Sequence, residues 1–408
     1  MENDMFFLKN IGLVGRIVIG LIIGVLAGLF IPRADFLGLF GAFFIGALKA
    51  VAPALVFVLV MSALINASGS HAERFRKIVF LYLFSTLTAA IVAVLVSFAF
   101  PVKMNFLQAA ASSAPGGLKE VALALLSNLV DNPVSALLKA NYIGILIWAI
   151  VFGIALKKQA TEPTKNMISQ FAEALTTIVR WIISLAPIGI MGIVFTTVSQ
   201  NGMSVFETYG KLVGVLVFTM LFIAMVVNPM IVFFLMRRNP YPLVFKCLKG
   251  SGLTAFFTRS SAANIPVNME LCEELQLDKE VYSVSVPLGA TVNMDGAAVT
   301  ITVMTMAAVH TLGIDVTIPA AIMMSILAAL AACGASGVAG GAVLLIPLAC
   351  SLFGISNDIA MQVVAVGFTV GVIQDSLETA LNSSGDVLFV AASEFSDKIK
   401  RGEPLPKL

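Results

Sequence analysis

The segment "VIQDSLETALNSSGD", residues 372–386, places three carboxylates between two hydrophobic stretches. In a helix, successive residues are about 100° apart, so five of its polar side chains fall on one face. These side chains are Asp375, Glu378, Thr379, Asn382 and Asp386. An acid at the centre of a bilayer costs about 2.5–3.5 kcal/mol even on the lenient insertion scale, so the stripe cannot face lipid. We expect it to face a cavity or an opposite charge inside the protein.

The composition is that of an integral membrane protein. Of 408 residues, 59% are hydrophobic and 12% are charged, whereas soluble domains carry about 25% charged residues. The net charge of +2 indicates no nucleic-acid partner. The four cysteines and two histidines lack metal-ligand spacing, and no small-residue cleavage site follows the first apolar run. We therefore expect packing roles for the cysteines and a first span that is retained.

A helix that crosses a membrane needs about 20 apolar residues. The first part of the chain predicts such helices at about 11–31, 38–66, 77–101, 138–156, 170–198 and 208–236. Residues 102–137 predict a long loop with a short helix. Basic residues cluster after the second, fourth, sixth and last spans, as at Arg74, Lys157, Arg237 and Lys398. By the positive-inside rule, both termini lie in the cytoplasm.

The last third of the chain predicts two re-entrant helical hairpins. Residues 243–275 and 318–355 each contain two short apolar arms around a polar or glycine-rich centre. Irregular backbone at membrane depth is tolerated only inside protein or beside a cavity, and paired interrupted segments indicate a transporter binding site. A longer helix follows each hairpin, at about 281–310 and 358–394, which is the pattern of an inverted repeat. The alternative is two hairpins that cross the membrane completely.

A second polar group lies in "PLGATVNMDGAAVT", residues 287–300. Asn293 and Asp295 stand in apolar sequence between Gly289 and Gly296. These glycines and Pro287 weaken the helix and free carbonyl groups. Carboxylate, amide and carbonyl oxygens suit a hard cation, so we predict a cation site here.

The hairpin centres supply groups for a substrate. "TRSSAANIP", residues 258–266, offers backbone amides, hydroxyls and Arg259, and "GASGVAGG", residues 334–341, lets backbone N–H groups approach a carboxylate. The glycine-rich segment is also a plausible hinge. Tight helix packing is the alternative role for its glycines.

These four motifs, in this order, resemble the signatures of the dicarboxylate/amino acid:cation symporters, the glutamate transporter family. Within it, the chain looks most like the bacterial sodium-coupled serine/threonine symporters. The resemblance implies an all-α integral membrane homotrimer in the bacterial cytoplasmic (inner) membrane. Each protomer would have eight transmembrane helices and two re-entrant hairpins. The motion would be of the elevator type, with residues 1–240 mainly scaffold, a transport core at 241–396 and a cytoplasmic tail at 397–408. The third and sixth spans would move with the core.

The resemblance also implies site residues. Asp375 matches the acid that binds the substrate ammonium, Asn382 the amide near the substrate carboxylate, and Thr379 a nearby hydroxyl. Arg259 matches an arginine close to that acid. The implied substrate contacts are Asp375, Thr379, Asn382, Glu378, Ser260, Ser261, Val338, Gly340 and Ala297. The implied gating residues are Arg259, Gly334, Ser336 and Gly337.

Sodium is the implied co-transported ion, and no organic cofactor is expected. One site is matched by Gly289, Asn293, Asn382 and Asp386. A second, deeper site is matched by Asp295, Tyr82, Ser85 and Thr86. A third, under the second hairpin, is matched by Thr291, Met294, Cys333 and Ala335.

The chain departs from the members that carry acidic substrates at two positions. They have arginine in place of Glu378 and threonine in place of Ala297. That arginine pairs with the substrate's side-chain carboxylate, which a glutamate would repel. A carboxyl group does bond a hydroxyl, so serine and threonine fit.

The sequence therefore predicts sodium-coupled uptake of serine and threonine, and no enzymatic activity. The alternatives are a proton-coupled carrier, with Glu378 or Asp386 as the proton site, and a carrier of other small neutral amino acids or dicarboxylates. A channel and an intramembrane aspartyl protease are further alternatives. The protease would need two opposed acids and a water.

Overall fold

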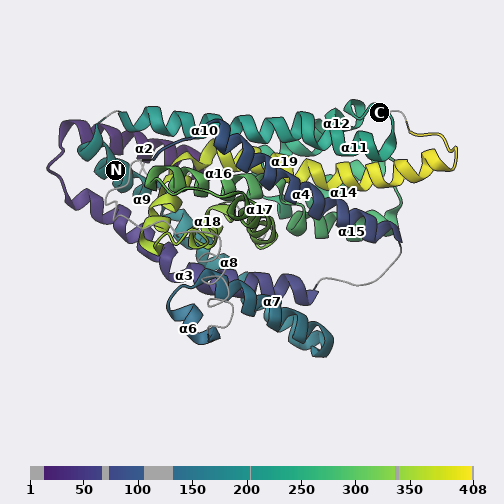
Figure 1. Ribbon diagram of the computed structural model, residues 1–408, viewed down its shortest axis with the longest axis horizontal. Coiled ribbons are helices and arrows are strands. Elements are labelled where there is room, and N and C mark those ends of the chain that lie inside the picture. The colour runs from purple at the N-terminus through teal and green to yellow at the C-terminus, as the bar shows by residue number, and fades with distance from the viewer. Residues whose placement is uncertain (1–12, 67–72, 105–131, 203, 336–339, 407–408) are drawn as a thin grey trace, which may run out of the picture.

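The computed structural model describes residues 13–66, 73–104, 132–202, 204–335 and 340–406. These residues form helices, turns and loops, and no strand is found among them. Figure 1 shows an elongated molecule in which α10, α4 and α19 run along the long axis. The all-helical architecture expected from the sequence is confirmed for this part of the chain.

The first half of the described chain consists mainly of apolar helices. They are α2 (Leu13–Phe30), α3 (Phe36–Asn66), α4 (Glu73–Ala99), α6 (Pro133–Leu138), α7 (Tyr142–Gln159), α8 (Glu162–Ser184), α9 (Ala186–Asn201), α10 (Ser204–Phe222), the π-helix η1 (Ile223–Val227) and α11 (Asn228–Met236). Each predicted span before residue 240 falls on one or more of these helices. The range 170–198 is a pair of helices, α8 and α9, bent by 53°. Pro187 in the first turn of α9 has no N–H to continue the hydrogen-bond ladder of α8.

Small residues let α2 lie directly against α9. A Cβ atom at Gly20 would stand 2.1 Å from the carbonyl oxygen of Pro187, and one at Gly24 would stand 2.5 Å from that of Met191. Membrane helices lack a strong hydrophobic driving force for association, so close backbone approach through glycines is a common way to pack them. Helices α2 and α9 lie side by side at the left of Figure 1.

The second half covers the two ranges for which hairpins are predicted and the two ranges of the longer helices predicted after them. Its elements are α12 (Tyr241–Cys247), the π-helix η2 (Leu248–Gly252), α13 (Leu253–Thr258), α14 (Ser261–Glu274), α15 (Lys279–Val292), α16 (Asp295–Leu312), α17 (Ile318–Ala332), the 3₁₀ helix η3 (Ala342–Leu345), α18 (Ile346–Ser351) and α19 (Asn357–Lys400). Helices α15 and α16 occupy the predicted 281–310 range, and α19 contains the predicted 358–394 range.

Each hairpin range contains two helical arms with a break between them. In the first, Arg259 ends α13 in the left-handed conformation with φ of 53°, and the side chain of Ser260 caps α14 by accepting from the backbone N–H of Ala263 at 3.2 Å. In the second, the break follows Cys333 and includes Gly340, whose φ is +74°. Ser336, Gly337 and Val338 lie outside the described residues. The same holds for residues 105–131 of the loop predicted at 102–137, whereas the short helix α6 lies at the end of that range.

Five helices in the described part of the chain are long and apolar enough to cross a membrane, or six if α8 and α9 form one bent span. Many large apolar side chains on their outer faces are exposed, for example Trp181 at 67% and Leu95 at 61%. Such a surface suits contact with lipid. The multi-pass membrane protein expected from the composition is thus supported by the structure.

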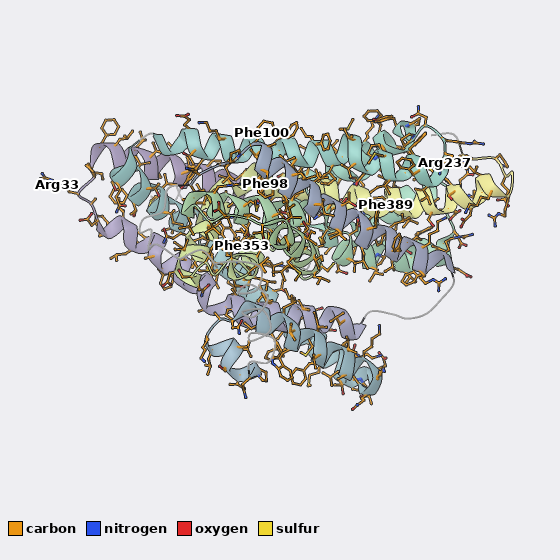
Figure 2. All side chains as sticks on the ribbon, in the orientation of Figure 1. Arg33, Phe98, Phe100, Arg237, Phe353 and Phe389 are labelled. Carbon is orange, nitrogen blue, oxygen red and sulfur yellow. The ribbon has the colours of Figure 1, made fainter. Side chains whose placement is uncertain are left out.

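Charged residues mark the ends of the molecule. Arg33 and Arg237 lie near opposite ends of its long axis (Figure 2). At the end where α4 begins and α19 finishes, Arg74 pairs with Asp278 at 3.3 Å and with Asp397 at 3.4 Å, and Lys77 pairs with Asp397 at 2.9 Å. The loop before α15 and the two helix ends therefore meet on one side, as the predicted topology requires.

Helices α16 and α19 form the centre of the second half. Every residue of α16 from Asp295 to Val309 is buried, and most of α19 is buried as well. Helices α4, α10 and α11 pack around them. A helix buried on all sides can carry polar groups only if they find partners, so the central helices are where a polar site has to be built.

Candidate substrate and cation site

The polar stripe of α19 lies inside the protein. All five of its side chains are buried, from Asp386 at 0% exposed to Glu378 at 6%. Their partners come from both hairpin ranges, the α15–α16 break, α16 and α19 itself. The expectation that this face avoids lipid is confirmed.

Asp375 is held by the two hairpin breaks. Arg259 donates from Nε at 2.7 Å and pairs through Nη2 at 2.6 Å with Oδ2 of Asp375, and the backbone N–H of Gly340 donates to Oδ1 at 3.1 Å. Thr379 donates its hydroxyl to the backbone carbonyl of Asp375 at 2.7 Å. The guanidinium supplies the positive charge and N–H donors that a substrate ammonium group would offer the same carboxylate.

A small cavity of about 20 Å³ adjoins this ion pair. Arg259, Gly340, Gly371, Gln374 and Asp375 line it, together with apolar side chains. Its size is that of about one water molecule. A whole amino acid would fit there only if residues that line the cavity moved.

Glu378 points toward α16. Its Oε2 atom accepts from the hydroxyl of Thr300 at 2.7 Å and from the side-chain amide of Gln374. The same amide donates to Thr300 Oγ1 at 2.7 Å. Glu378, Thr300 and Gln374 thus form a closed triad next to Asp375. Ala297 is fully buried one turn before Thr300.

Asp386 and Asn293 meet where α15 is broken from α16. Asn293 Nδ2 donates to Asp386 Oδ1 at 3.2 Å and to the carbonyl of Asn382 at 3.0 Å. The backbone N–H of Gly296 donates to Asn382 Oδ1 at 2.7 Å. A Cβ at Gly289 would lie 2.7 Å from Asp386 Oδ1, so only glycine leaves the carboxylate in place. The structure brings together the four residues predicted for the first sodium site.

The break itself was expected from Pro287 and the two glycines, and it falls at Asn293 and Met294. The helical ladder stops there, and the freed groups bond to side chains instead. Met294 donates its backbone N–H to Thr86 Oγ1 at 3.1 Å, and its sulfur accepts from Asn382 Nδ2 at 3.4 Å.

Asp295 lies deeper, among hydroxyl and amide groups. Ser85 and Thr86 of α4 donate to its Oδ1 at 2.9 and 3.3 Å, and Asn228 of α11 donates to its Oδ2 at 2.9 Å. Ser85 also lies 3.2 Å from Asn293 Oδ1, which links this group to the first. Tyr82 donates its hydroxyl to the carbonyl of Asp386 at 3.0 Å.

The residues predicted for the third sodium site are close to the same break. Cys333 Sγ lies 3.5 Å from the carbonyl oxygen of Val292, and Ala335 is buried. Thr291 donates its hydroxyl to the backbone carbonyl of Leu288 at 2.9 Å. The backbone carbonyl of Thr291 itself belongs to the last turn of α15. Gly334 packs against α3, since a Cβ there would lie 3.0 Å from Val60 Cγ2.

The oxygen atoms of these groups suit a hard cation. Among the described residues, no group of three or more His, Cys, Asp or Glu side chains that could hold a metal ion is found. The two acids are instead surrounded by neutral hydroxyl, amide and carbonyl oxygens, which are suitable ligands for sodium. Residues of this kind fit the co-transported ion that the sequence predicts.

Several polar residues in this region were not singled out from the sequence. Asn264 and Asn268 of α14 bond to Ser383 of α19, with Asn264 Nδ2 to Ser383 Oγ at 2.8 Å, and Asn268 Nδ2 lies 3.5 Å from Asp386 Oδ2. Gln374 and Thr300 were likewise overlooked, as was Asn228, which follows a π-helical turn. The sequence does contain a signal for the asparagines, because a buried amide in an apolar segment needs a partner. Two asparagines are spaced four residues apart in "ANIPVN", and one precedes proline in "VVNPM".

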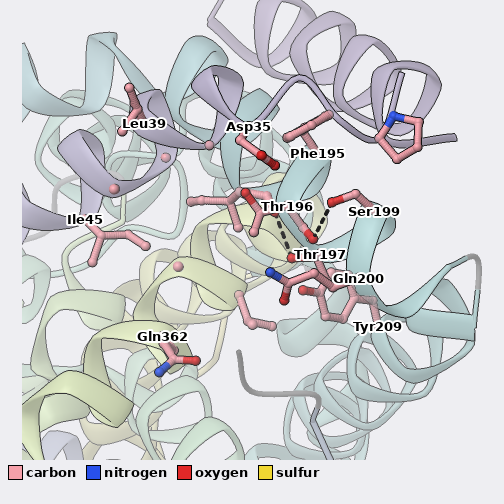
Figure 3. A pocket seen from close by; sticks show the side chains of 17 residues that line it. Asp35, Leu39, Ile45, Phe195, Thr196, Thr197, Ser199, Gln200, Tyr209 and Gln362 are labelled. Atoms are coloured by element: carbon pink, nitrogen blue, oxygen red, sulfur yellow. Dashed lines mark hydrogen bonds between the residues drawn. The ribbon is translucent and has the colours of Figure 1, made fainter. Parts of the chain in front are cut away.

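A larger pocket of about 500 Å³ lies elsewhere, between α3, α9, α10 and the first turns of α19 (Figure 3). The Thr and Ser hydroxyls that line it donate to backbone carbonyls of the same helix. Thr196 donates to the carbonyl of Gly192 at 3.0 Å, and Ser199 donates to that of Thr196 at 3.0 Å. Its acid, Asp35, is solvent-exposed. It offers no buried charge for an ammonium group within the described residues, so the region around Asp375 is the stronger candidate.

Comparison with known proteins agrees with the resemblance read from the motifs. A model of the sodium:dicarboxylate symporter family matches residues 13–394. The chain is 58% identical over 395 residues to "Serine/threonine transporter SstT" of Bifidobacterium adolescentis, which covers 97% of this chain and 92% of that protein. It is 56% identical over 390 residues to the protein of the same name from Streptococcus agalactiae, covering 95% and 97%. A third relative of that name, from Streptococcus thermophilus, is 56% identical over 386 residues, covering 94% and 96%.

The relatives are transporters by name, and their similarity extends over nearly the whole chain. The protein is accordingly a transporter and not an enzyme, and the protease alternative is dropped. The chain belongs to the sodium:dicarboxylate symporter family.

Proposed function

We propose that the protein is a sodium-coupled, secondary-active importer of serine and threonine. The observation that carries the proposal is the buried carboxylate of Asp375, paired with the side chain of Arg259 and adjoining a small cavity. An amino-acid ammonium group would give that carboxylate a cation in place of Arg259, whose side chain is 14% exposed and would then turn toward water. The names of the relatives that align over nearly the whole chain agree with the substrate.

The remaining site residues divide into substrate and ion ligands. Asn382, Thr379 and the backbone at Ser260, Ser261, Val338 and Gly340 would receive the substrate carboxylate. Glu378, where acidic-substrate members have arginine, disfavours a second carboxylate on the substrate. Asp386 and Asn293 would hold one sodium ion and Asp295 another. Their partners are the hydroxyl, amide and carbonyl oxygens that surround them.

The proposed architecture is that of an elevator-type transporter, in which a transport core moves against a scaffold. Residues 1–240 would form mainly the scaffold, and residues 241–396 the moving core, in a homotrimer with eight spans and two re-entrant hairpins per protomer. The protein would lie in the inner membrane of a bacterium, with both termini on the cytoplasmic side. The meeting of Arg74, Lys77 and Asp397 at one end of the molecule supports a common side for those segments.

A proton-coupled carrier is the competing reading, because Glu378 and Asp386 are buried acids. The test is uptake of radiolabelled serine into proteoliposomes at fixed pH, with sodium or choline outside. Sodium-coupled transport predicts uptake only with sodium. Equal uptake in choline, with a response to an imposed pH gradient, would favour the proton-coupled carrier.

A further inference from the structure

Gln374, which precedes the proposed ammonium ligand, is a buried residue with an unused acceptor. Its side chain is 1% exposed, and its Oε1 atom has no hydrogen-bond donor among the described residues. Buried side-chain oxygens normally have a partner, since desolvation without one is costly. An acceptor left free beside a cavity calls for a donor inside that cavity, which a water supplies when the site is empty and a substrate hydroxyl supplies when it is occupied.

The orientation of this amide is fixed by its neighbours. Gln374 Nε2 donates to Thr300 Oγ1 at 2.7 Å and to Glu378 Oε2. Both N–H groups are thereby used. Turning the amide over would place its oxygen against the carboxylate oxygen of Glu378, which offers no proton when ionised. With Glu378 ionised, Glu378 and Thr300 act as positioning residues that hold the Gln374 oxygen away from themselves.

The free oxygen belongs to a residue that lines the cavity at Asp375. Gln374, Asp375, Arg259 and Gly371 all line that cavity. A Cβ added to Gly371 would lie 4.0 Å from Gln374 Oε1 and within 4 Å of no other counted heavy atom, so the space between the two residues is open. The apolar side chains of Val343 and Phe368 complete the wall.

We infer that Gln374 is a specificity-determining residue whose Oε1 atom accepts a hydrogen bond from the β-hydroxyl group of the substrate. The inference rests on the proposed function, because it assumes that the substrate ammonium binds Asp375. A serine or threonine hydroxyl lies one carbon from the carbon that bears the ammonium group, and Gln374 is the chain neighbour of Asp375. Alanine would leave the acceptor unpaired, and a site built to bond a hydroxyl rejects such analogues strongly.

This assignment gives Glu378 and Gln374 different roles in substrate selection. Glu378 disfavours acidic substrates, whereas Gln374 selects for a hydroxyl among the neutral ones. Because Oε1 only accepts, the substrate must donate. A group of similar size without a proton, such as fluorine, cannot replace the hydroxyl.

The first arm of the test uses the wild-type protein in proteoliposomes with a sodium gradient. Unlabelled serine, 3-fluoroalanine and alanine compete with labelled serine. We expect 3-fluoroalanine to compete about as weakly as alanine, roughly 10- to 100-fold less well than serine. Competition by 3-fluoroalanine equal to that of serine would overturn the inference whatever the variants do.

The second arm uses Gln374→Met, which keeps the length of the side chain and removes the acceptor. The serine-to-alanine preference should fall by about 10-fold or more, while sodium dependence persists. The control is Gln362→Met, the same change about three turns earlier on α19, at the wall of the larger pocket. It should keep the wild-type preference.

The outcomes distinguish the two proposals. If the wild type accumulates neither serine nor threonine with sodium, the proposed function fails and this inference fails with it. If the wild type is hydroxyl-selective and Gln374→Met keeps the full preference, the assignment of Gln374 is wrong and the proposed function stands.

Discussion

At the scale of single residues, the site is organised by buried acids that differ in their partners. Asp375 has a cationic partner, Arg259, whereas Asp295 and Asp386 have neutral hydroxyl and amide groups. A carboxylate with an exchangeable cation suits a substrate ammonium, and carboxylates among neutral oxygens suit sodium. Glu378 faces another neutral set, Thr300 and Gln374.

The role of Asp375 is tested by Asp375→Asn. Removing the charge leaves Arg259 without its anion and a substrate ammonium without its counterion, so serine affinity should fall at least about 100-fold. Serine binding to the purified variant, followed by calorimetry, measures this. Size-exclusion chromatography checks that the variant is folded. A folded variant that binds serine normally would show that the ammonium binds elsewhere.

The role of Glu378 is tested by reversing its charge. Glu378→Arg places a second cation beside Arg259 and removes the acceptor of Thr300 and Gln374. It should abolish serine and threonine transport and allow weak aspartate binding, more so with Ala297→Thr. A shift of a few kcal/mol, or about 100-fold in relative affinity, is expected for such a change in a partly dry site.

Competition of unlabelled serine, threonine, alanine and aspartate against labelled serine gives the ranking for the wild type and for Glu378→Gln. Binding of labelled aspartate is measured for Glu378→Arg. Glu378→Gln should be milder, because its amide oxygen still accepts from Thr300. A Glu378→Arg variant that still transports serine and threonine and binds no aspartate would mean that Glu378 does not influence the substrate side chain.

At the scale of elements, the break between α15 and α16 creates the cation site. Asn293 and Met294 leave the helix, and their groups bond to α4 and α19. Asp386 fits against α15 only because residue 289 lacks a side chain. The break, the stripe of α19 and the hydroxyls of α4 therefore form one unit.

This unit is tested by Gly289→Ala. The added methyl would lie 2.7 Å from Asp386 Oδ1, so the carboxylate must move. The apparent affinity for sodium should fall by about 10-fold, with a smaller effect on serine affinity at saturating sodium. Gly214→Ala in α10 is the matched control, since a Cβ there meets nothing within 4 Å. Equal sodium dependence in the two variants would place the ion away from Asp386.

The elements could largely be predicted from the sequence, because long apolar runs and the interruptions at Arg259 and Gly340 are local signals. The break after α15 was expected from Pro287, Gly289 and Gly296. The bend between α8 and α9 was missed, since a span of 170–198 ignored the consequence of Pro187. Partners such as Asn228, Asn268 and Thr300 could not be assigned, because their pairing depends on how distant helices pack rather than on spacing within one helix.

At the scale of the whole molecule, the second half carries the site and the first half supplies hydroxyls and packing. Ser85 and Thr86 of α4 and Asn228 of α11 reach the acid at the start of α16. Contacts such as Phe44 with Phe368, whose ring centroids are 5.6 Å apart, join α3 to α19. In an elevator mechanism, the contact between Phe44 and Phe368 would change during transport. The contacts of α4 and α11 with Asp295 would be kept.

Concentrative uptake tests the central claim most directly. Proteoliposomes are prepared with the same serine concentration inside and outside, and only a sodium gradient is imposed. The account predicts that serine accumulates inside, that a sodium ionophore abolishes accumulation, and that a proton ionophore does not. Accumulation that survives the sodium ionophore, or that follows an imposed pH gradient without sodium, would contradict sodium-coupled serine transport.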